Sequence, residues 1–142
     1  MKSIKETNLY TEVLKEFNYT FGNVFIFDGY VVSEISEGIV FSWEAQAEQI
    51  TIDIASFLET DGSDVIYISN RVHSYSVMAA DWHKFFKNCY NLQGYYVVGQ
   101  EKCSIINTMF ENLFFKSKIR KFTNIETAVA LAKEYKSKVV EV

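Results

Sequence analysis

The stretch Val65–Ser76 carries the side chains of this sequence that are best suited to chemistry. An apolar run, Val65–Ile68, leads into a polar loop whose candidate binding residues are Asn70, Arg71, His73, Ser74 and Ser76. A helical pattern then begins near Met78. Loops that leave the carboxyl ends of buried strands and lead to helix starts are where α/β proteins usually place a site. The sequence therefore predicts an exposed binding loop here.

Arg71 and His73 suggest what this loop could bind. Their donors could converge, together with free backbone N–H groups at the helix start, on a phosphate or a carboxylate. The alternative is that Arg71 pairs with a nearby carboxylate and that His73 braces the loop, because polar loop residues often bond only to their own surroundings. Both alternatives describe a non-catalytic site.

Catalytic and metal chemistry find little support in the sequence. Ser74 or Ser76 beside His73 makes a crude nucleophile and base pair, but the G-x-S-x-G motif is absent, and we expect these hydroxyls to cap a helix. His73, His83, Asp81 and Cys89 do not have a recognised metal-ligand spacing. Cys89 and Cys103 are the two cysteines, and free thiols are expected. We therefore predict no enzyme, no cofactor and no metal.

Composition limits the class of protein. The chain has 142 residues, of which 49% are hydrophobic and 23% charged, as expected of one folded domain spanning residues 1–142. The net charge of −4 argues against binding to nucleic acid or to anionic membranes. The sequence contains neither an apolar run of about 18 residues nor a signal peptide pattern, so a cytoplasmic protein without a membrane span is expected.

The first half of the chain predicts an edge strand, a hairpin and a helix. We expect an edge strand within Leu9–Phe17 after a loose N-terminus, Met1–Asn8. Asp28-Gly29 lies between two runs rich in β-branched and aromatic residues, which predicts a hairpin with a type I′ turn. Ser42 can cap a helix. The inward face of that helix is predicted to contain Trp43, Ala47, Ile50, Ile54, Phe57 and Leu58.

Strands and helices alternate in the second half. Buried strands are predicted at Val65–Ile68 and Gly94–Val98, and a short strand at Lys118–Phe122. Three helices are predicted. The inward face of the first contains Met78, Trp82, Phe85, Phe86 and Cys89, and the second is capped by Ser104. The third follows a capping box at Thr123–Glu126, and its inward face contains Ile125, Ala128, Val129, Ala132 and Tyr135. This order predicts an α/β fold with a mixed β-sheet, in which an N-terminal antiparallel hairpin precedes β-α alternation and helices pack on the sheet.

Three stretches carry a resemblance to a known family. They are F-D-G-Y-V-V-S-E-I-S-E-G-I-V-F, Y-I-S-N-R-V-H-S-Y-S-V and F-F-K-S-K-I-R-K-F-T-N-I-E-T-A. With this order of elements, the chain resembles the SpoIIAA-like, or STAS, superfamily, and in particular small bacterial proteins described as STAS/SEC14-domain proteins. The resemblance implies a regulatory module in which Ser76 is a possible phospho-acceptor. Tyr67 and Tyr75 stand where the family's aspartates are expected.

Two classes of function follow. The first is a STAS-like interaction or regulatory module that binds a protein partner or a small anion through the loop after Val65–Ile68, with a homodimer left open. The second is a carrier or sensor of a small apolar or amphipathic ligand, which the SEC14 association and the 16% aromatic content suggest. A solid core would favour the module. The carrier would be favoured by a cavity among Trp43, Phe57, Trp82, Phe85 and Phe110.

Overall fold

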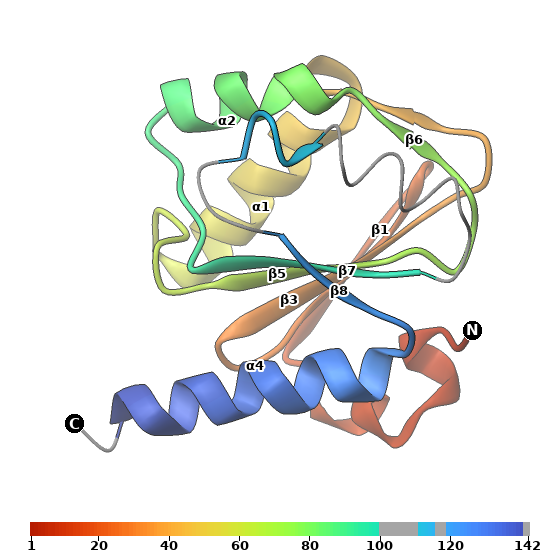
Figure 1. Ribbon diagram of the computed structural model, residues 1–142, viewed down its shortest axis with the longest axis vertical. Helices are drawn as coiled ribbons and strands as arrows, with labels where there is room; N and C mark the ends of the chain where they lie inside the picture. The colour runs from red at the N-terminus through yellow and green to blue at the C-terminus, as the bar shows by residue number, and fades with distance from the viewer. Residues whose placement is uncertain (100–110, 116–118, 141–142) are drawn as a thin grey trace.

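A mixed β-sheet, with six strands among the residues that the structure describes, forms the centre of the protein. The computed structural model describes residues 1–99, 111–115 and 119–140, with the backbone alone for residues 137–140. Within that part the chain is α/β, and Figure 1 shows two helices, α1 and α2, on one face of the sheet. The long helix α4 and the N-terminal segment cover the other face. The predicted fold class is confirmed at this level.

The strand order in the sheet is β1-β2-β3-β5-β7-β8. These strands comprise Lys15–Tyr19 (β1), Gly22–Ile26 (β2), Tyr30–Ile35 (β3), Ile66–Asn70 (β5), Gly94–Val98 (β7) and Arg120–Phe122 (β8). A separate two-stranded parallel sheet pairs Val40–Phe41 (β4) with Ser76–Val77 (β6). The described α-helices are Glu48–Leu58 (α1), Trp82–Lys87 (α2) and Ile125–Val140 (α4). Short helical turns occupy Ile4–Glu6, Asn8–Glu12, Trp43–Ala47 and Ala79–Asp81.

The predicted hairpin and the predicted parallel strands are both present. β2 and β3 pair antiparallel around Asp28-Gly29, while β3, β5, β7 and β8 run parallel to one another. The type I′ prediction is wrong, because only Gly29 (φ 90°) has a positive φ in the turn. That pattern is typical of a type II turn, which needs glycine at its second central position alone.

The N-terminal segment is fixed rather than loose. Ile4 is fully buried, and the Glu34 carboxylate accepts hydrogen bonds from Ser3 Oγ (2.6 Å) and from Ile4 N (2.7 Å). The Asn70 amide donates to the carbonyl of Lys2 (3.0 Å) and to Glu34 (2.8 Å). The predicted edge strand exists, but it begins only at Lys15, because the residues before it form a helical turn.

The helix that follows Ser42 begins as predicted and differs at its far end. Ser42 Oγ accepts a hydrogen bond from Ala45 N, and a π-helical turn, Trp43–Ala47, leads into α1. The prediction that Phe57 faces the sheet is wrong, since Phe57 is 44% exposed. The inward stripe advances in steps of four, through Ile50, Ile54 and Leu58. Each such step turns by about 40°, which leaves Phe57 outside the stripe.

The second and last helices also depart from the predicted faces. Met78 lies before α2 and Cys89 lies after it, in a left-handed conformation with φ 68°, and both are exposed. Ile125, Ala128, Val129 and Ala132 of α4 are buried as predicted. Tyr135 is 40% exposed, because the C-terminal half of α4 runs past the strands in Figure 1. At the start of α4, Asn124 Oδ1 accepts a cap hydrogen bond from Thr127 N (2.8 Å).

Some predictions fall on residues that the structure does not describe. They are the helix capped by Ser104, the thiol of Cys103 and the start of the strand at Lys118. Among the described residues, no helix combines the length and the apolar composition that crossing a membrane requires.

The burial pattern yields a prediction about stability. Ile68 lies in the central strand β5 and is 0% exposed, whereas Ile52 on α1 is 44% exposed. Replacing Ile68 by alanine should lower the free energy of unfolding by about 2–5 kcal/mol, because the truncation leaves a cavity in the core. The same change at Ile52 should cost less than about 1 kcal/mol. Urea unfolding of both variants would measure the difference, and equal costs would contradict the strand assignment.

Candidate functional site

A strip of polar side chains crosses the sheet beneath α1 and α2. Because side chains alternate between the two faces of a strand, every second residue of β3, β5 and β7 points to this face. The polar residues on it are Ser33, Tyr67, Ser69, Arg71 and Tyr95, among apolar neighbours such as Val31 and Val97. Ser33 and Tyr67 share a hydrogen bond of 2.7 Å.

The strip is centred on a buried ion pair between Arg71 and Glu111. Arg71 Nη2 donates to Glu111 Oε1 at 2.7 Å, and the two side chains are 1% and 0% exposed. The other carboxylate oxygen accepts the Tyr95 hydroxyl (2.8 Å) and the Trp82 indole N–H (2.9 Å). Three side chains from distant parts of the sequence thus converge on one carboxylate. These hydrogen bonds stabilise the buried carboxylate, whereas Arg71 Nη1 has no hydrogen-bond partner among the described residues.

The remaining surroundings of Arg71 hold its guanidinium in place. Arg71 Nε donates to Ser69 Oγ (3.2 Å), and the guanidinium carbon lies 5.4 Å from the centre of the Tyr75 ring. Tyr75 and Ser69 share a hydrogen bond of 2.5 Å. Burial by itself lowers the pKa of Arg71, but the interactions with Tyr95, Tyr75 and Glu111 outweigh it and hold that pKa well above its ordinary value. Arg71 is therefore a permanent buried cation.

Two tyrosines of the strip are held in their neutral form. Burial raises the pKa of Tyr67 and of Tyr95 well above the usual tyrosine value. Their rings stack with centroids 5.4 Å apart and planes 10° from parallel. Tyr95 therefore serves as a fixed neutral donor to Glu111, and neither hydroxyl is set up to act as a base near neutral pH.

The predicted loop residues do not form one exposed cluster. Strand alternation sends Asn70 to the α4 face, where it is buried against the N-terminal segment, and sends Arg71 to the opposite face. The prediction that Asn70 and Arg71 present free donors at an exposed rim is therefore wrong. His73, Ser74 and Ser76 are exposed, and their part in binding stays a prediction. The helix start also differs, since β6 and a helical turn separate the loop from α2.

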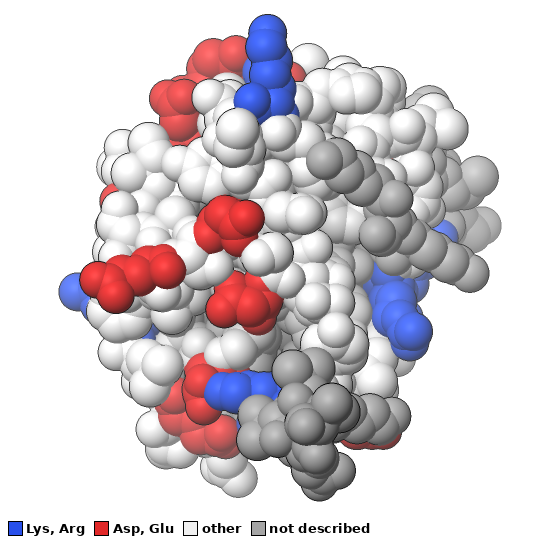
Figure 2. All heavy atoms as spheres, turned by 90° about the vertical axis from the view of Figure 1, so that its left-hand side faces the viewer, with Lys and Arg blue, Asp and Glu red and all other residues white. Residues whose placement is uncertain are grey.

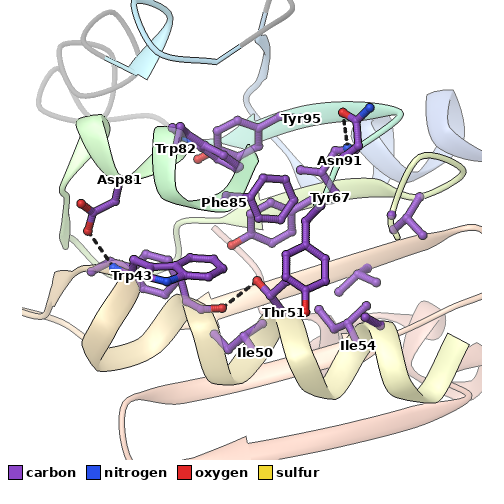
Figure 3. Close-up of a pocket in the computed structure, with 18 of the residues that line it drawn as sticks. Trp43, Ile50, Thr51, Ile54, Tyr67, Asp81, Trp82, Phe85, Asn91 and Tyr95 are labelled. Atoms are coloured by element: carbon purple, nitrogen blue, oxygen red, sulfur yellow. Dashed lines mark hydrogen bonds between the residues drawn. The ribbon is translucent and has the colours of Figure 1, made fainter. Parts of the chain in front are cut away.

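A pocket of about 100 Å³ lies between α1, α2 and the polar strip. Figure 3 shows Trp43, Ile50 and Ile54 on the side of α1, with Trp82 and Phe85 of α2 facing them. Its walls are mostly apolar and aromatic, and Glu111 and Tyr95 also line it. Of the residues predicted to surround a cavity, Trp43, Trp82 and Phe85 do so. Phe57 is not part of this lining, and Phe110 lies outside the described residues.

Sequence reasoning missed Glu111, the residue that organises this site. It lies between the apolar doublets Met109-Phe110 and Leu113-Phe114, and a lone carboxylate in such a setting was the available signal. A carboxylate on an apolar helical pattern is costly to bury without a partner, so it points to a buried cation elsewhere in the chain. Arg71 was the matching candidate.

Comparisons of the chain with models of protein families, with curated proteins and with solved structures returned no match. Within residues 1–99, 111–115 and 119–136, no group of three or more His, Cys, Asp or Glu side chains is placed to hold a metal ion. The pocket and its polar wall are thus the features from which function must be argued.

Arg71 and His73 provide a matched test of the site's architecture. Replacing Arg71 by alanine should lower the free energy of unfolding by about 3–5 kcal/mol, because it leaves Glu111 buried and unpaired. The same change at exposed His73 should have an effect within about 0.5 kcal/mol. Denaturant unfolding of both variants is the measurement. A wild-type stability for Arg71→Ala would contradict the buried pair.

The raised pKa values predict a loss of stability in alkaline solution. Unfolded tyrosines lose their protons near pH 10, whereas Tyr67 and Tyr95 keep theirs to higher pH in the folded protein. Between the unfolded and the folded pKa values, the unfolded chain binds fewer protons than the folded protein. The contribution of these tyrosines to the free energy of unfolding is therefore complete below about pH 10 and decreases as the pH rises further. Tyr67→Phe should flatten this decline. Urea unfolding at a series of alkaline pH values measures it, and an unchanged slope would contradict the assignment.

Proposed function

We propose that this protein is a non-catalytic binding module for a small amphipathic molecule, which it holds in the pocket between α1 and α2. The observation that carries the proposal is the pocket itself, since a solid core was the alternative at this position. Small-molecule sites are concave, mostly apolar and furnished with a few fixed polar groups. Ile50, Ile54 and Phe85 supply the apolar walls, and Glu111 and Tyr95 supply the polar wall.

The size of the pocket limits the ligand. Its volume of about 100 Å³ is somewhat smaller than that of an engineered apolar cavity of about 150 Å³ that binds benzene. A small ring, or a branched group of similar size, is therefore the largest apolar group that we expect the pocket to enclose. A longer ligand would insert one end into the pocket, and the rest of it would extend to the rim, which Asp61 and Asn91 help to form.

The hydrogen bonds that Glu111 already accepts support a binding role over a catalytic one. A general base needs a free acceptor that can take a proton from a bound substrate. Both oxygens of Glu111 already accept hydrogen bonds from Arg71, Tyr95 or Trp82. A carboxylate held in this way is a fixed feature of the wall.

The loop Asn70–Ser76 is the second candidate surface, and one observation favours it. Tyr75 lines the pocket, while its neighbours Ser74 and Ser76 are exposed at the surface. An occupant that displaced Tyr75 would alter the exposed loop, which suits a regulatory module in the cytoplasm that reports binding to a protein partner. The SpoIIAA-like arrangement, with Ser76 as phospho-acceptor, belongs to this proposal and is supported by the hairpin followed by parallel β-α alternation.

Filling the pocket tests the proposed function. Ile54 lines the pocket, whereas Ile52 on the same helix is exposed and does not line it. Toluene, titrated into labelled protein, should shift the NMR signals of the Ile50 and Val65 methyl groups. Ile54→Trp should abolish these shifts because the indole occupies the cavity, and Ile52→Trp should leave them unchanged.

Two results would count against the proposal. Absence of toluene binding to the wild-type protein would mean that the pocket does not accept apolar groups. Equal binding by Ile54→Trp and the wild type, with both folded by circular dichroism, would place the ligand elsewhere. Native mass spectrometry of protein purified from its own host would then identify which molecule, if any, it carries.

A further inference from the structure

We infer that the pocket selects an organic cation, an amine or quaternary ammonium ion with a small apolar body. This inference rests on the proposed function and adds the chemical class of the ligand. It is drawn from three features of the described lining: the sign of its charged groups, the direction of its hydrogen bonds and the arrangement of its aromatic rings.

The charged side chains that line the pocket are all acidic in the part of the chain that the structure describes. They are Asp61, Asp81 and Glu111, and that described lining includes no lysine, arginine or histidine. Arg71 neutralises Glu111 but is not itself part of the lining. Lys84 lies 3.3 Å from Asp81 and is about half exposed, also outside the lining. The charged side chains of the lining itself are therefore all negative, and Asp61 makes no ion pair with a described lysine or arginine.

One of these carboxylates, Asp61, is held in the ionised form near the rim. Asp61 Oδ1 accepts hydrogen bonds from Ser63 N (2.9 Å) and Ser63 Oγ (2.7 Å), and these bonds lower the pKa of Asp61. Asp81 Oδ2 accepts the backbone N–H of Trp43 (2.7 Å). The loop that follows α1 carries further exposed acids, Glu59 and Asp64. Figure 2, which views the side of the molecule on which this loop lies, shows acidic groups near the centre of that face.

The hydrogen bonds of the polar wall also favour a cation as the ligand. The Arg71 guanidinium, the Trp82 N–H and the Tyr95 hydroxyl all direct donors at Glu111. These donors are all engaged, so the wall faces a ligand with the oxygens of Glu111 and Tyr95, which carry negative or partly negative charge although they already accept hydrogen bonds. An ammonium N–H or a polarised N-methyl group suits such acceptors, whereas a carboxylate or phosphate would be repelled by them.

The aromatic rings form adjoining walls of a box. Phe85 meets Trp82 with planes 87° apart and Trp43 with planes 75° apart, at centroid distances of 5.3 Å and 6.3 Å. Tyr90 also lines the pocket and packs on Phe85. Ring faces attract cations, and tryptophan does so most strongly. Rings at large angles to one another can surround a compact cation, as aromatic cages for quaternary ammonium groups do.

A matched set of probes tests the inference by isothermal titration calorimetry. Choline carries a trimethylammonium group, dimethylbutanol replaces it with a neutral tert-butyl group of the same shape, and dimethylbutyrate is a corresponding anion. Choline should bind the wild-type protein at least about tenfold more tightly than dimethylbutanol. Dimethylbutyrate should bind most weakly.

A charge variant adds a second readout. Asp81→Asn keeps an oxygen that can accept the Trp43 N–H, so it should weaken choline binding severalfold and leave dimethylbutanol binding unchanged. Asp28→Asn removes the same charge from the exposed hairpin, outside the described pocket lining, and should change neither.

The outcomes separate this inference from the proposed function. Dimethylbutanol binding as tightly as choline would overturn the cation inference and leave an apolar binding pocket in place. Toluene binding without choline binding would overturn it as well. Failure of toluene, choline and dimethylbutanol alike would remove both the inference and the proposed function.

Discussion

The buried ion pair between Arg71 and Glu111 is the interaction on which the rest of this structure depends. Removing two charges from water costs several kcal/mol for each ion, and mutual attraction offsets that cost only when the geometry is good and further hydrogen bonds complete it. Here the carboxylate receives donors from Arg71, Tyr95 and Trp82, and Arg71 is bonded in turn to Ser69. If either Arg71 or Glu111 is removed, the other charge stays buried without a partner, and its desolvation cost is no longer offset.

This network also explains why a pocket exists. It joins β5, β7, α2 and the turn at Glu111 through polar contacts whose geometry is fixed by distance and direction. Trp82 is held by its N–H, so its ring cannot move freely to fill the space toward Ile50 and Ile54 of α1. Packing that maximised apolar contact would close this gap. The polar wall therefore stabilises an opening between the helices, and the same wall gives the opening its acceptor character.

Much of the fold could be predicted because its signals are local. The hairpin at Asp28-Gly29, the parallel strands and the cap at Ser42 each depend on a few neighbouring residues. The site could not be predicted in the same way. Arg71 and Glu111 are 40 residues apart in sequence, and only the fold brings them together. Side chains alternate along a strand, so Asn70 and Arg71 lie on opposite faces of the sheet. The inward stripe of α1 advances in four-residue steps, so Phe57 points outward. Predictions from local polarity and spacing alone therefore placed Asn70, Arg71 and Phe57 wrongly.

A double-mutant cycle on Arg71 and Glu111 tests the central claim most directly. Urea unfolding would be measured for Arg71→Met, Glu111→Leu and the double variant, all of which keep apolar bulk at the two positions. Each single change should destabilise the protein by about 3–5 kcal/mol, and the double variant should recover much of that loss because no charge stays buried alone. The expected coupling energy is at least about 2 kcal/mol. Additive effects, or single variants as stable as the wild type, would contradict the account.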